Sequence, residues 1–254
     1  MFKQQKRVGL ALGGGAVRGL AHLGVLAVLE REEIPVHYLA GTSVGSLVGA
    51  MFCAGLSVAE LEYIASHIGW RHMARPVRSR QGLVSFSKLE SLISELLGDL
   101  TFADLDIPMA IVTADMQTGQ TIVLTEGALA PAIVASCCVP GLVEPRTLNG
   151  YLLGDGGIVN NIPASVVRDM GANYVIAVDI FEPRFRLNSP LGIGFTALEI
   201  LVDRAGEGYK KADCLITPHL AGMSYFLFRE RQQLIDRGRE ATEYALPGLR
   251  LALG

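Results

Sequence analysis

Short apolar runs alternate along this chain with longer segments in which apolar residues recur at helical spacing. Val8–Leu12 is apolar throughout, which is typical of a strand buried in a parallel sheet. The helical pattern of Val17–Glu32 follows, and Val36–Ala40 and Val44–Ala54 repeat the strand and the helix. Further helices are predicted over Val58–Ile68, Ser87–Leu97, Leu129–Cys138, Pro163–Met170, Ala197–Lys211 and Arg229–Tyr244, and further strands over Ile107–Ala114, Thr121–Leu124, Tyr151–Leu153, Tyr174–Ile180 and Cys214–Thr217.

This alternation predicts the fold class. Strands separated by helices are typical of an α/β fold with a doubly wound, mostly parallel central sheet flanked by helices on both faces. Ile107–Ala114 and Thr121–Leu124 are joined by a short polar link that contains a glycine, which predicts an antiparallel pair. Because the chain shows no internal repeat or long linker, we expect a single domain over residues 1–254 with its core at about residues 7–245.

Composition narrows the function classes. Half of the 254 residues are hydrophobic and only 19% are charged, so the chain can bury a sizeable core. The net charge of −3 gives no electrostatic case for nucleic acid as a partner. No C-x-x-C pair and no calcium-loop motif occurs, so neither a metal nor another cofactor is expected. The cysteines, which fit a reducing, cytoplasmic compartment as buried free thiols, are Cys53, Cys137, Cys138 and Cys214.

Two segments bear on membranes. Ile34–Ala59 holds no charged residue, but its glycines, serines and proline predict a strand, a tight turn and a buried helix instead of a membrane span. Trp70–Arg80 contains no acid and four arginines, Arg71, Arg75, Arg78 and Arg80. Such a segment either docks on an anionic bilayer, where each basic residue contributes about 1 kcal/mol, or is a solvated connector. We expect a cytoplasmic protein that is peripherally membrane-associated if the arginines dock on lipid.

Two glycine-bearing turns carry the candidate chemistry. Gly41–Gly45 reads Gly-Thr-Ser-Val-Gly between a predicted strand and a predicted helix, the context in which a G-x-S-x-G turn raises a serine oxygen out of the chain. Ser43 is therefore predicted as a nucleophile. Gly13–Gly15 leads into the first helix, whose free backbone N–H groups and dipole favour negative charge. A nucleophile and an anion-binding loop together predict acyl transfer with a stabilised oxyanion.

The serine needs a base, and the residues alone leave two candidates. Asp155 ends a predicted strand within Asp155–Gly157, where the glycines permit close approach of a substrate, although an ordinary Asp-Gly turn would explain the same residues. His219 follows a strand late in the chain, where the Ser…Asp…His order of α/β-hydrolases places the histidine. A dinucleotide-binding loop is excluded, because a G-x-G-x-x-G run that begins at Gly13 has Arg18 at its last position.

The order of these motifs resembles that of the patatin-like phospholipase family, in particular its compact bacterial members and the catalytic domain of the neuropathy-target-esterase type. The resemblance rests on Leu12–Gly19 with Leu20–Leu26 after it, on Gly41–Gly45 and on Asp155–Gly157. It spans about residues 7–245. It implies a three-layer α/β/α fold and a serine lipid acyl hydrolase that cleaves carboxylic ester bonds of phospholipids or lysophospholipids without a cofactor.

The resemblance also implies roles for individual residues. Ser43 would be the nucleophile of a Ser–Asp dyad that forms an acyl-enzyme, and Asp155 would be its general base and acid. Arg18 would steady the glycine loop or meet a lipid phosphate. The family's loop often has a fourth glycine where this chain has Ala16, which restricts the backbone at the helix entrance. The implied oxyanion hole is Gly13, Gly14 and Gly15, and the implied supporting positions are Gly41, Gly45, Gly156 and Gly157.

Two alternatives stay open at this point. One is a histidine-dependent esterase of the α/β-hydrolase type that uses His219, and the other is a catalytically silent scaffold that only binds lipid. The first predicts loss of turnover when His219 is replaced by alanine, whereas a Ser–Asp dyad predicts that turnover is retained.

Overall fold

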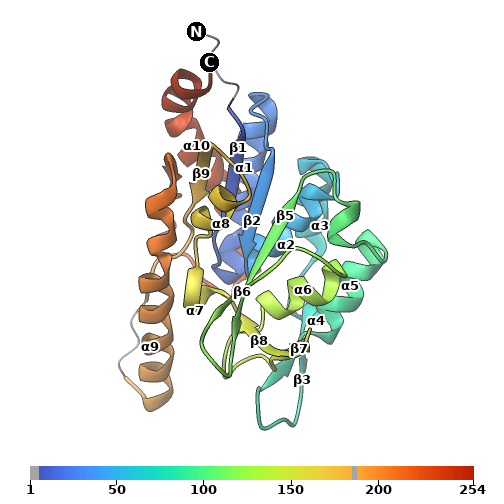
Figure 1. The fold of residues 1–254 in the computed structure, drawn as a ribbon. Helices are drawn as coiled ribbons and strands as arrows, with labels where there is room; N and C mark the ends of the chain where they lie inside the picture. The colour runs from blue at the N-terminus through green and yellow to red at the C-terminus, as the bar shows by residue number, and fades with distance from the viewer. Residues whose placement is uncertain (1–5, 185–187) are drawn as a thin grey trace.

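The computed structural model describes residues 6–184 and 188–254, which build one large mixed sheet (Figure 1). The strand order is β10-β9-β1-β2-β5-β8-β7, and β6 pairs with β5 off this path. The strands from β10 to β5 are parallel, whereas β6 and β8 are antiparallel to β5, and β7 is antiparallel to β8. The strands are β1 (Val8–Leu12), β2 (Tyr38–Thr42), β5 (Met109–Asp115), β6 (Thr121–Leu124), β7 (Arg146–Leu148), β8 (Tyr151–Asp155), β9 (Tyr174–Val178) and β10 (Cys214–Ile216).

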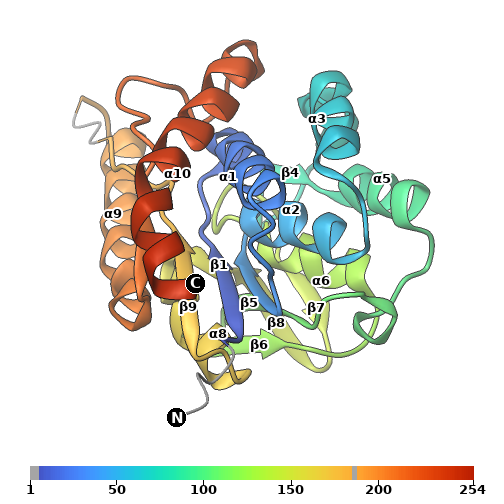
Figure 2. The same ribbon diagram turned by 90° about the horizontal axis from the view of Figure 1, so that it is seen from above.

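Helices cover both faces of this sheet (Figure 2). α1 lies along α10, while α2 and α6 pack over β2 and β5 on the same side, and α8 packs on the opposite side against β1, β2 and β9. A separate two-stranded sheet pairs β3 (Arg75–Pro76) with β4 (Val84–Ser85). The α-helices are α1 (Leu20–Arg31), α2 (Val44–Cys53), α3 (Val58–His67), α4 (Trp70–Met73), α5 (Ser87–Leu97), α6 (Leu129–Ser136), α7 (Gly157–Asn160), α8 (Ala164–Asp169), α9 (Pro190–Ala205) and α10 (Arg231–Leu253). The 3-10 helices span Ala16–Gly19, Phe102–Asp104, Gly206–Lys211 and Phe228–Glu230.

The two faces of the parallel strands differ in side-chain size. Successive residues of a strand point to opposite faces. In β1, Leu10 and Leu12 therefore belong to the larger hydrophobic core, which α1, α2, α6 and α10 complete. Ala11 faces the smaller core beneath α8, together with Ala40 of β2 and Ala177 of β9. Small side chains on this face let α8 pack close to the sheet, so both faces are closed to water.

The candidate residues gather at one end of the sheet. Because β1 and β2 are parallel neighbours, the glycine loop after Leu12 and the turn after Thr42 leave the sheet at the same edge. β8 runs in the opposite direction to β5, and its last residue, Asp155, pairs with Thr113 near the end of β5. The carboxyl ends of parallel strands are the usual place for a ligand site in an α/β sheet.

The predicted α/β class, with a mostly parallel sheet and helices on both faces, is confirmed, and so is the antiparallel pairing of β5 with β6. α10 continues past the predicted end at Tyr244 and runs through Pro247, a residue type that normally ends a helix. α9 begins at Pro190, before the predicted Ala197. The sequence pattern missed the short elements α4, β3, β4, β7 and α7.

Residues 1–5 of the predicted domain, and residues 185–187, lie outside the described residues. None of the described helices is both long enough and apolar enough to cross a bilayer.

Candidate active site

Ser43 lies in a tight turn between β2 and α2. Its backbone has φ 54° and ψ −126°, which is strained for a residue with a side chain. The flanking glycines are required by close packing. A Cβ on Gly45 would lie 2.2 Å from the carbonyl oxygen of Leu12, and one on Gly41 would lie 2.6 Å from the carbonyl oxygen of Gly45. The G-x-S-x-G spacing therefore lets α2 start directly against β1 and β2, with the serine at the corner.

The side chain of Ser43 meets that of Asp155. Ser43 Oγ donates a hydrogen bond of 2.7 Å to Asp155 Oδ2 across 112 positions of sequence. The second carboxylate oxygen, Oδ1, accepts the N–H of Gly157 at 2.8 Å, which fixes the plane of the carboxylate. Both side chains belong to nearly buried residues, with exposed fractions of 9% for Ser43 and 7% for Asp155. Gly156 permits this turn, because a Cβ there would lie 2.3 Å from the carbonyl oxygen of Val112.

Burial changes the acidity of this carboxyl group. Desolvation raises the pKa of Asp155 to about 6, and the hydrogen bonds from Ser43 and Gly157 oppose the rise because they stabilise the charged form. A carboxylate with a pKa near 6 is mostly ionised at pH 7 but holds a proton far more readily than an exposed aspartate. That is the acidity expected of a group that must both accept and return a proton near neutral pH.

The backbone of Ser43 is held by a second serine. The N–H of Ser43 donates to Ser136 Oγ at 2.8 Å, and Ser136 Oγ donates to the carbonyl oxygen of Val112 at 2.7 Å. Ser136 is completely buried at the end of α6. Sequence reasoning assigned it no role. The available signal was a single hydroxyl in an otherwise apolar helix, Leu129–Ser136, since a buried hydroxyl requires a partner.

The glycine loop lies beside Ser43, but its amides are used differently. The N–H of Gly13 donates to the carbonyl oxygen of Val178 at 3.1 Å, and that of Gly14 donates to Asn161 Oδ1 at 3.1 Å. Among the described residues no acceptor is found for the N–H groups of Gly15 and Ala16, nor for that of Val44. These three amides are therefore the ones that are free to bind an oxyanion in this structure.

Two features of the loop depart from a simple glycine turn. Ala16 adopts φ 49°, the left-handed conformation that glycine prefers, so the alanine carries strain where a fourth glycine would carry none. His22 Nε2 lies 2.8 Å from the carbonyl oxygen of Gly13, and burial lowers the pKa of His22 to about 4. His22 is therefore neutral at pH 7 and donates this bond through its Nε2–H.

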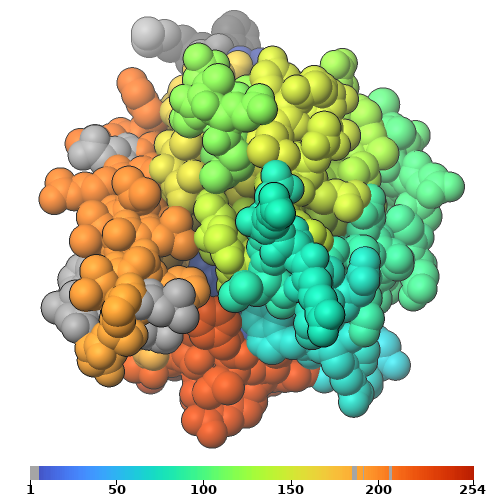
Figure 3. Space-filling view, turned by 90° about the horizontal axis from the view of Figure 1, so that it is seen from below, coloured from blue at the N-terminus to red at the C-terminus, as the bar shows by residue number. Residues whose placement is uncertain are grey.

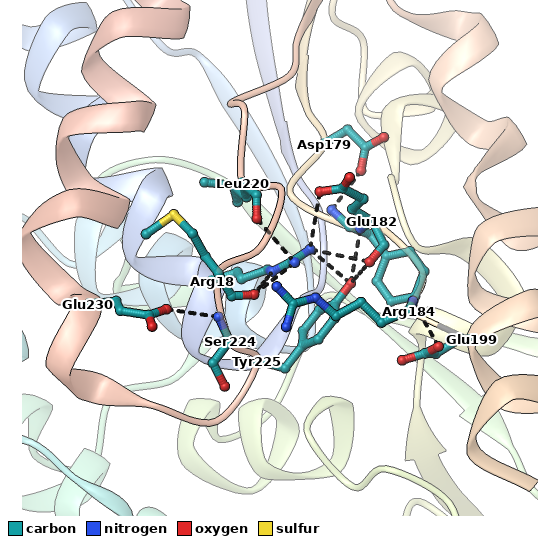
Figure 4. A network of polar contacts seen from close by, with 11 residues as sticks. Arg18, Asp179, Glu182, Arg184, Glu199, Leu220, Ser224, Tyr225 and Glu230 are labelled. Atoms are coloured by element: carbon teal, nitrogen blue, oxygen red, sulfur yellow. Dashed lines mark hydrogen bonds and ion pairs between the residues drawn. The ribbon is translucent and has the colours of Figure 1, made fainter. Parts of the chain in front are cut away.

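Arg18 is completely buried, with an exposed fraction of 0%. Figure 4 shows its guanidinium at the centre of a network of polar contacts. Its guanidinium donates to the carbonyl oxygen of Met223 at 2.9 Å, to that of Leu220 at 3.2 Å and to the hydroxyl of Tyr225 at 3.1 Å, and it stacks 4.0 Å from the Tyr225 ring. It also donates to the backbone of Glu182 at 3.3 Å. Arg18 thus joins the glycine loop to residues 220–225, and its charge does not reach the surface where a lipid phosphate would lie.

His219, the other candidate base, is exposed and follows β10. It lines neither of the cavities that contain Ser43, whereas Asp155 is bonded directly to the Ser43 hydroxyl. The described residues contain no group of three or more His, Cys, Asp or Glu side chains that could hold a metal ion. The geometry therefore brings together the serine, the aspartate and the glycine loop, and leaves the histidine apart.

Two cavities meet at Ser43. An apolar chamber of about 390 Å³ extends over α2 toward α3, α4 and α5, and a second chamber of about 280 Å³ lies between the glycine loop, α7 and α9. We call the second one the polar chamber because Asp155, Asn161 and Glu199 join its mostly hydrocarbon lining. Seen from below, the blue N-terminal part of the chain is visible at the bottom of a hollow between yellow, orange and red-orange segments, on the side of the polar chamber (Figure 3). Both linings include Ala16, Ser43, Val139, Leu142 and Phe226.

A buried serine on a strand-to-helix corner, bonded to a carboxylate beside free backbone amides, defines a candidate serine hydrolase on an α/β scaffold. The Patatin-like phospholipase family matches residues 10–168 of the chain. An NTE family protein of Mycobacterium tuberculosis is 33% identical over 177 residues, which cover 68% of this chain and 49% of that protein. The neuropathy target esterase sws of Drosophila melanogaster is 32% identical over 184 residues, which cover 68% of this chain and 13% of that protein.

Solved structures share the fold at low identity. VipD from Legionella pneumophila superposes with a TM-score of 0.57 at 13% identity, covering 96% of this chain and 67% of that chain. ExoU, in its complex with SpcU from Pseudomonas aeruginosa, superposes with a TM-score of 0.54 at 15% identity, covering 98% and 53%. The chain belongs to the patatin-like phospholipase family. It spans about half the length of the mycobacterial relative and a smaller part of the fly protein.

Proposed function

We propose that this chain is a serine lipid acyl hydrolase that cleaves carboxylic ester bonds of phospholipids or lysophospholipids through Ser43, Asp155 and an acyl-enzyme intermediate. The observation that carries the proposal is the 2.7 Å hydrogen bond from Ser43 Oγ to a buried carboxylate. Membership of the patatin-like phospholipase family supports the substrate class, and an apolar chamber that opens on the same serine suits a fatty acyl group.

The geometry of the site supports the following acylation step. Asp155 Oδ2 accepts the proton of Ser43 as Oγ attacks the ester carbonyl carbon, and the carbonyl oxygen becomes an oxyanion. In this proposal the glycine loop stabilises that oxyanion, with the free amide of Gly15 as its first donor and those of Ala16 and Val44 beside it. Gly13 and Gly14 shape the loop through their bonds to Val178 and Asn161.

Collapse of the tetrahedral intermediate completes the cycle. The carbonyl re-forms, the bond to the alcohol oxygen breaks, and protonated Asp155 returns its proton to that oxygen. Water then attacks the Ser43 ester while Asp155 accepts one of its protons, and the fatty acid leaves as Ser43 regains a proton. One carboxyl group therefore serves both half-reactions, for which a pKa of about 6 is suitable.

The test is hydrolysis of a defined panel of phospholipids and lysophospholipids, followed by fatty acid release. We expect turnover by the wild type and by His219→Ala, and loss of at least about a thousandfold in Ser43→Ala and Asp155→Asn. A His219→Ala variant that loses turnover while Asp155→Asn retains it would favour the histidine-dependent esterase. A wild-type protein that binds these lipids without releasing fatty acid would favour the silent scaffold.

We further propose that the arginine-rich segment Trp70–Arg80 contacts an anionic membrane surface. Its arginines are exposed along α4 and the β3–β4 hairpin. Trp70 itself does not point to lipid, because its indole N–H donates to the carbonyl oxygen of Phe226 at 2.7 Å and its ring lines the apolar chamber. Phe226 and Leu227 are exposed and lie next to this contact, so apolar side chains adjoin the start of the arginine-rich segment.

Vesicle co-sedimentation tests this contact. We expect the wild type to bind anionic vesicles more tightly than neutral ones, and the fourfold Arg71/Arg75/Arg78/Arg80→Ala variant to lose most of the difference, at about 1 kcal/mol for each arginine. A variant that replaces four exposed arginines outside this segment, Arg31, Arg204, Arg237 and Arg250, by alanine serves as the control for net charge. Equal binding by the wild type and the fourfold variant would refute membrane docking through this segment.

A further inference from the structure

We propose that the apolar chamber binds the acyl chain, that the polar chamber receives the alcohol leaving group, and that the stretch of α2 in the apolar chamber selects medium-chain acyl esters. The inference rests on the proposed function, because it takes Ser43 as the nucleophile and Asp155 as the proton carrier. It adds which part of the substrate lies in which cavity and which wall sets the chain length.

Proton transfer fixes the direction of the substrate. Asp155 lines the polar chamber and does not line the apolar one. The proton it carries must reach the alcohol oxygen, and such a transfer requires hydrogen-bond distance. The leaving group therefore lies on the polar side of Ser43. The acyl group that stays attached to Ser43 Oγ then extends into the other cavity, where Ser43 is also part of the wall.

The chemistry of the two linings agrees with this direction. Besides Ser43, the described side chains that line the apolar chamber are hydrocarbon, aromatic or sulfur-containing, and the one indole N–H among them, that of Trp70, is already bonded to Phe226. Such a wall favours a hydrocarbon chain. The lining of the polar chamber is also mostly hydrocarbon, but it adds groups that can bond to an alcohol, namely Asp155, Asn161 and Glu199. The Tyr225 hydroxyl in the same lining is already bonded to Arg18 and to the backbone of Glu182. Neither lining contains a described lysine or arginine, so a substrate phosphate lies outside both.

The stretch of α2 that lines the apolar chamber gives an estimate of the acyl chain length that fits. Val44, Leu47, Val48 and Met51 line the apolar chamber at helical spacing, beginning next to Ser43. From Val44 to Met51 the helix rises about 10 Å, at 1.5 Å per residue. An extended hydrocarbon rises roughly 1.3 Å per carbon, from the C–C bond length and a tetrahedral angle, so about eight carbons reach Met51. The volume, at about 30 Å³ for each methylene-sized unit, holds roughly thirteen.

A matched pair of leucines tests the assignment. Leu47 on α2 lines only the apolar chamber, Leu198 on α9 lines only the polar chamber, and both are half-buried. We would measure kcat/KM for nitrophenyl esters of increasing acyl length with the wild type, Leu47→Phe and Leu198→Phe. The wild type should peak between about eight and thirteen carbons. Leu47→Phe should move the peak to shorter chains and lower kcat/KM for the wild-type optimum by about tenfold or more.

Leu198→Phe should leave the optimal acyl length unchanged. In a second series of esters, with one acyl group and alcohols of increasing size, it should lower kcat/KM more for bulky alcohols than for small ones. If Leu47→Phe lacks the melting transition of the wild type, Leu47→Ala replaces it, and its optimum should move to longer chains. An acyl optimum that moves with Leu198→Phe, or that stays with both Leu47 variants, would overturn the assignment while leaving the hydrolase intact. Absence of any Ser43-dependent ester hydrolysis would instead refute the proposed function itself.

Discussion

The acidity of Asp155 makes the pH dependence of acylation a quantitative prediction. In the proposed mechanism the carboxyl group must be ionised to accept the Ser43 proton, and burial raises the pKa of Asp155 to about 6. The fraction ionised is then roughly 90% at pH 7, half at pH 6 and 10% at pH 5. We therefore expect kcat/KM to be level above pH 7 and to fall about tenfold for each pH unit below 6.

The assay is hydrolysis of a small nitrophenyl ester under kcat/KM conditions, with each sample quenched at alkaline pH before its absorbance is read. Enzyme incubated at each pH and assayed again at pH 7.5 controls for unfolding. The inflection does not belong to His22, since burial lowers its pKa to about 4. A rate that stays level down to pH 4.5 would refute the reasoning. A pH dependence that disappears in His219→Ala would do the same, and would transfer the role of base to the histidine.

Three further predictions concern the stability of the fold and the positioning of the Ser43 backbone. Because burial raises the pKa of Asp155 from 3.8 to about 6, the folded state of the wild type loses stability as the pH rises through that range. The free energy of unfolding of Asp155→Asn, measured by denaturant titration, should therefore exceed that of the wild type by about 3 kcal/mol at pH 8 and should equal it at pH 3. Ser136→Ala leaves the buried Ser43 N–H without its acceptor and should cost about 1–3 kcal/mol and lower kcat more than it raises KM. Ala16→Gly should raise the melting temperature by relieving about 1 kcal/mol of left-handed strain.

The fold class was predictable from the sequence because strands that are covered by helices on both faces have unbroken apolar sequences. The unbroken apolar run Val8–Leu12 and the helical spacing after it follow directly from burial in a parallel sheet. The α4–β3–β4 region was not predictable, since its two strands are two residues each and have no period to detect. α10 extends through Pro247 because tertiary packing, including that of buried Leu249, outweighs the local cost of a proline.

The candidate site also has residues that the sequence indicated and residues that only the structure could reveal. Glycine spacing around Ser43 reflects local backbone geometry, so the residues alone pointed to this serine. They left Asp155 and His219 as candidate bases, and the family resemblance favoured Asp155, whose Oδ2 lies 2.7 Å from Ser43 Oγ in the structure. The acceptors Ser136 and Asn161 depend on contacts across 93 and 147 positions, which no local pattern encodes. The buried position of Arg18 could not be predicted for the same reason, because its partner Tyr225 is 207 positions away in the sequence.

The central claim is that Ser43 becomes the acylated residue with Asp155 as its base and without a histidine. Its most direct test is covalent labelling by a fluorophosphonate at pH 7.5, read as intact-protein mass and as the modified peptide. The account predicts one adduct, on the peptide that contains Ser43, in the wild type and in His219→Ala, and none in Ser43→Ala or Asp155→Asn. An adduct that persists in folded Ser43→Ala, or that requires His219, would contradict it.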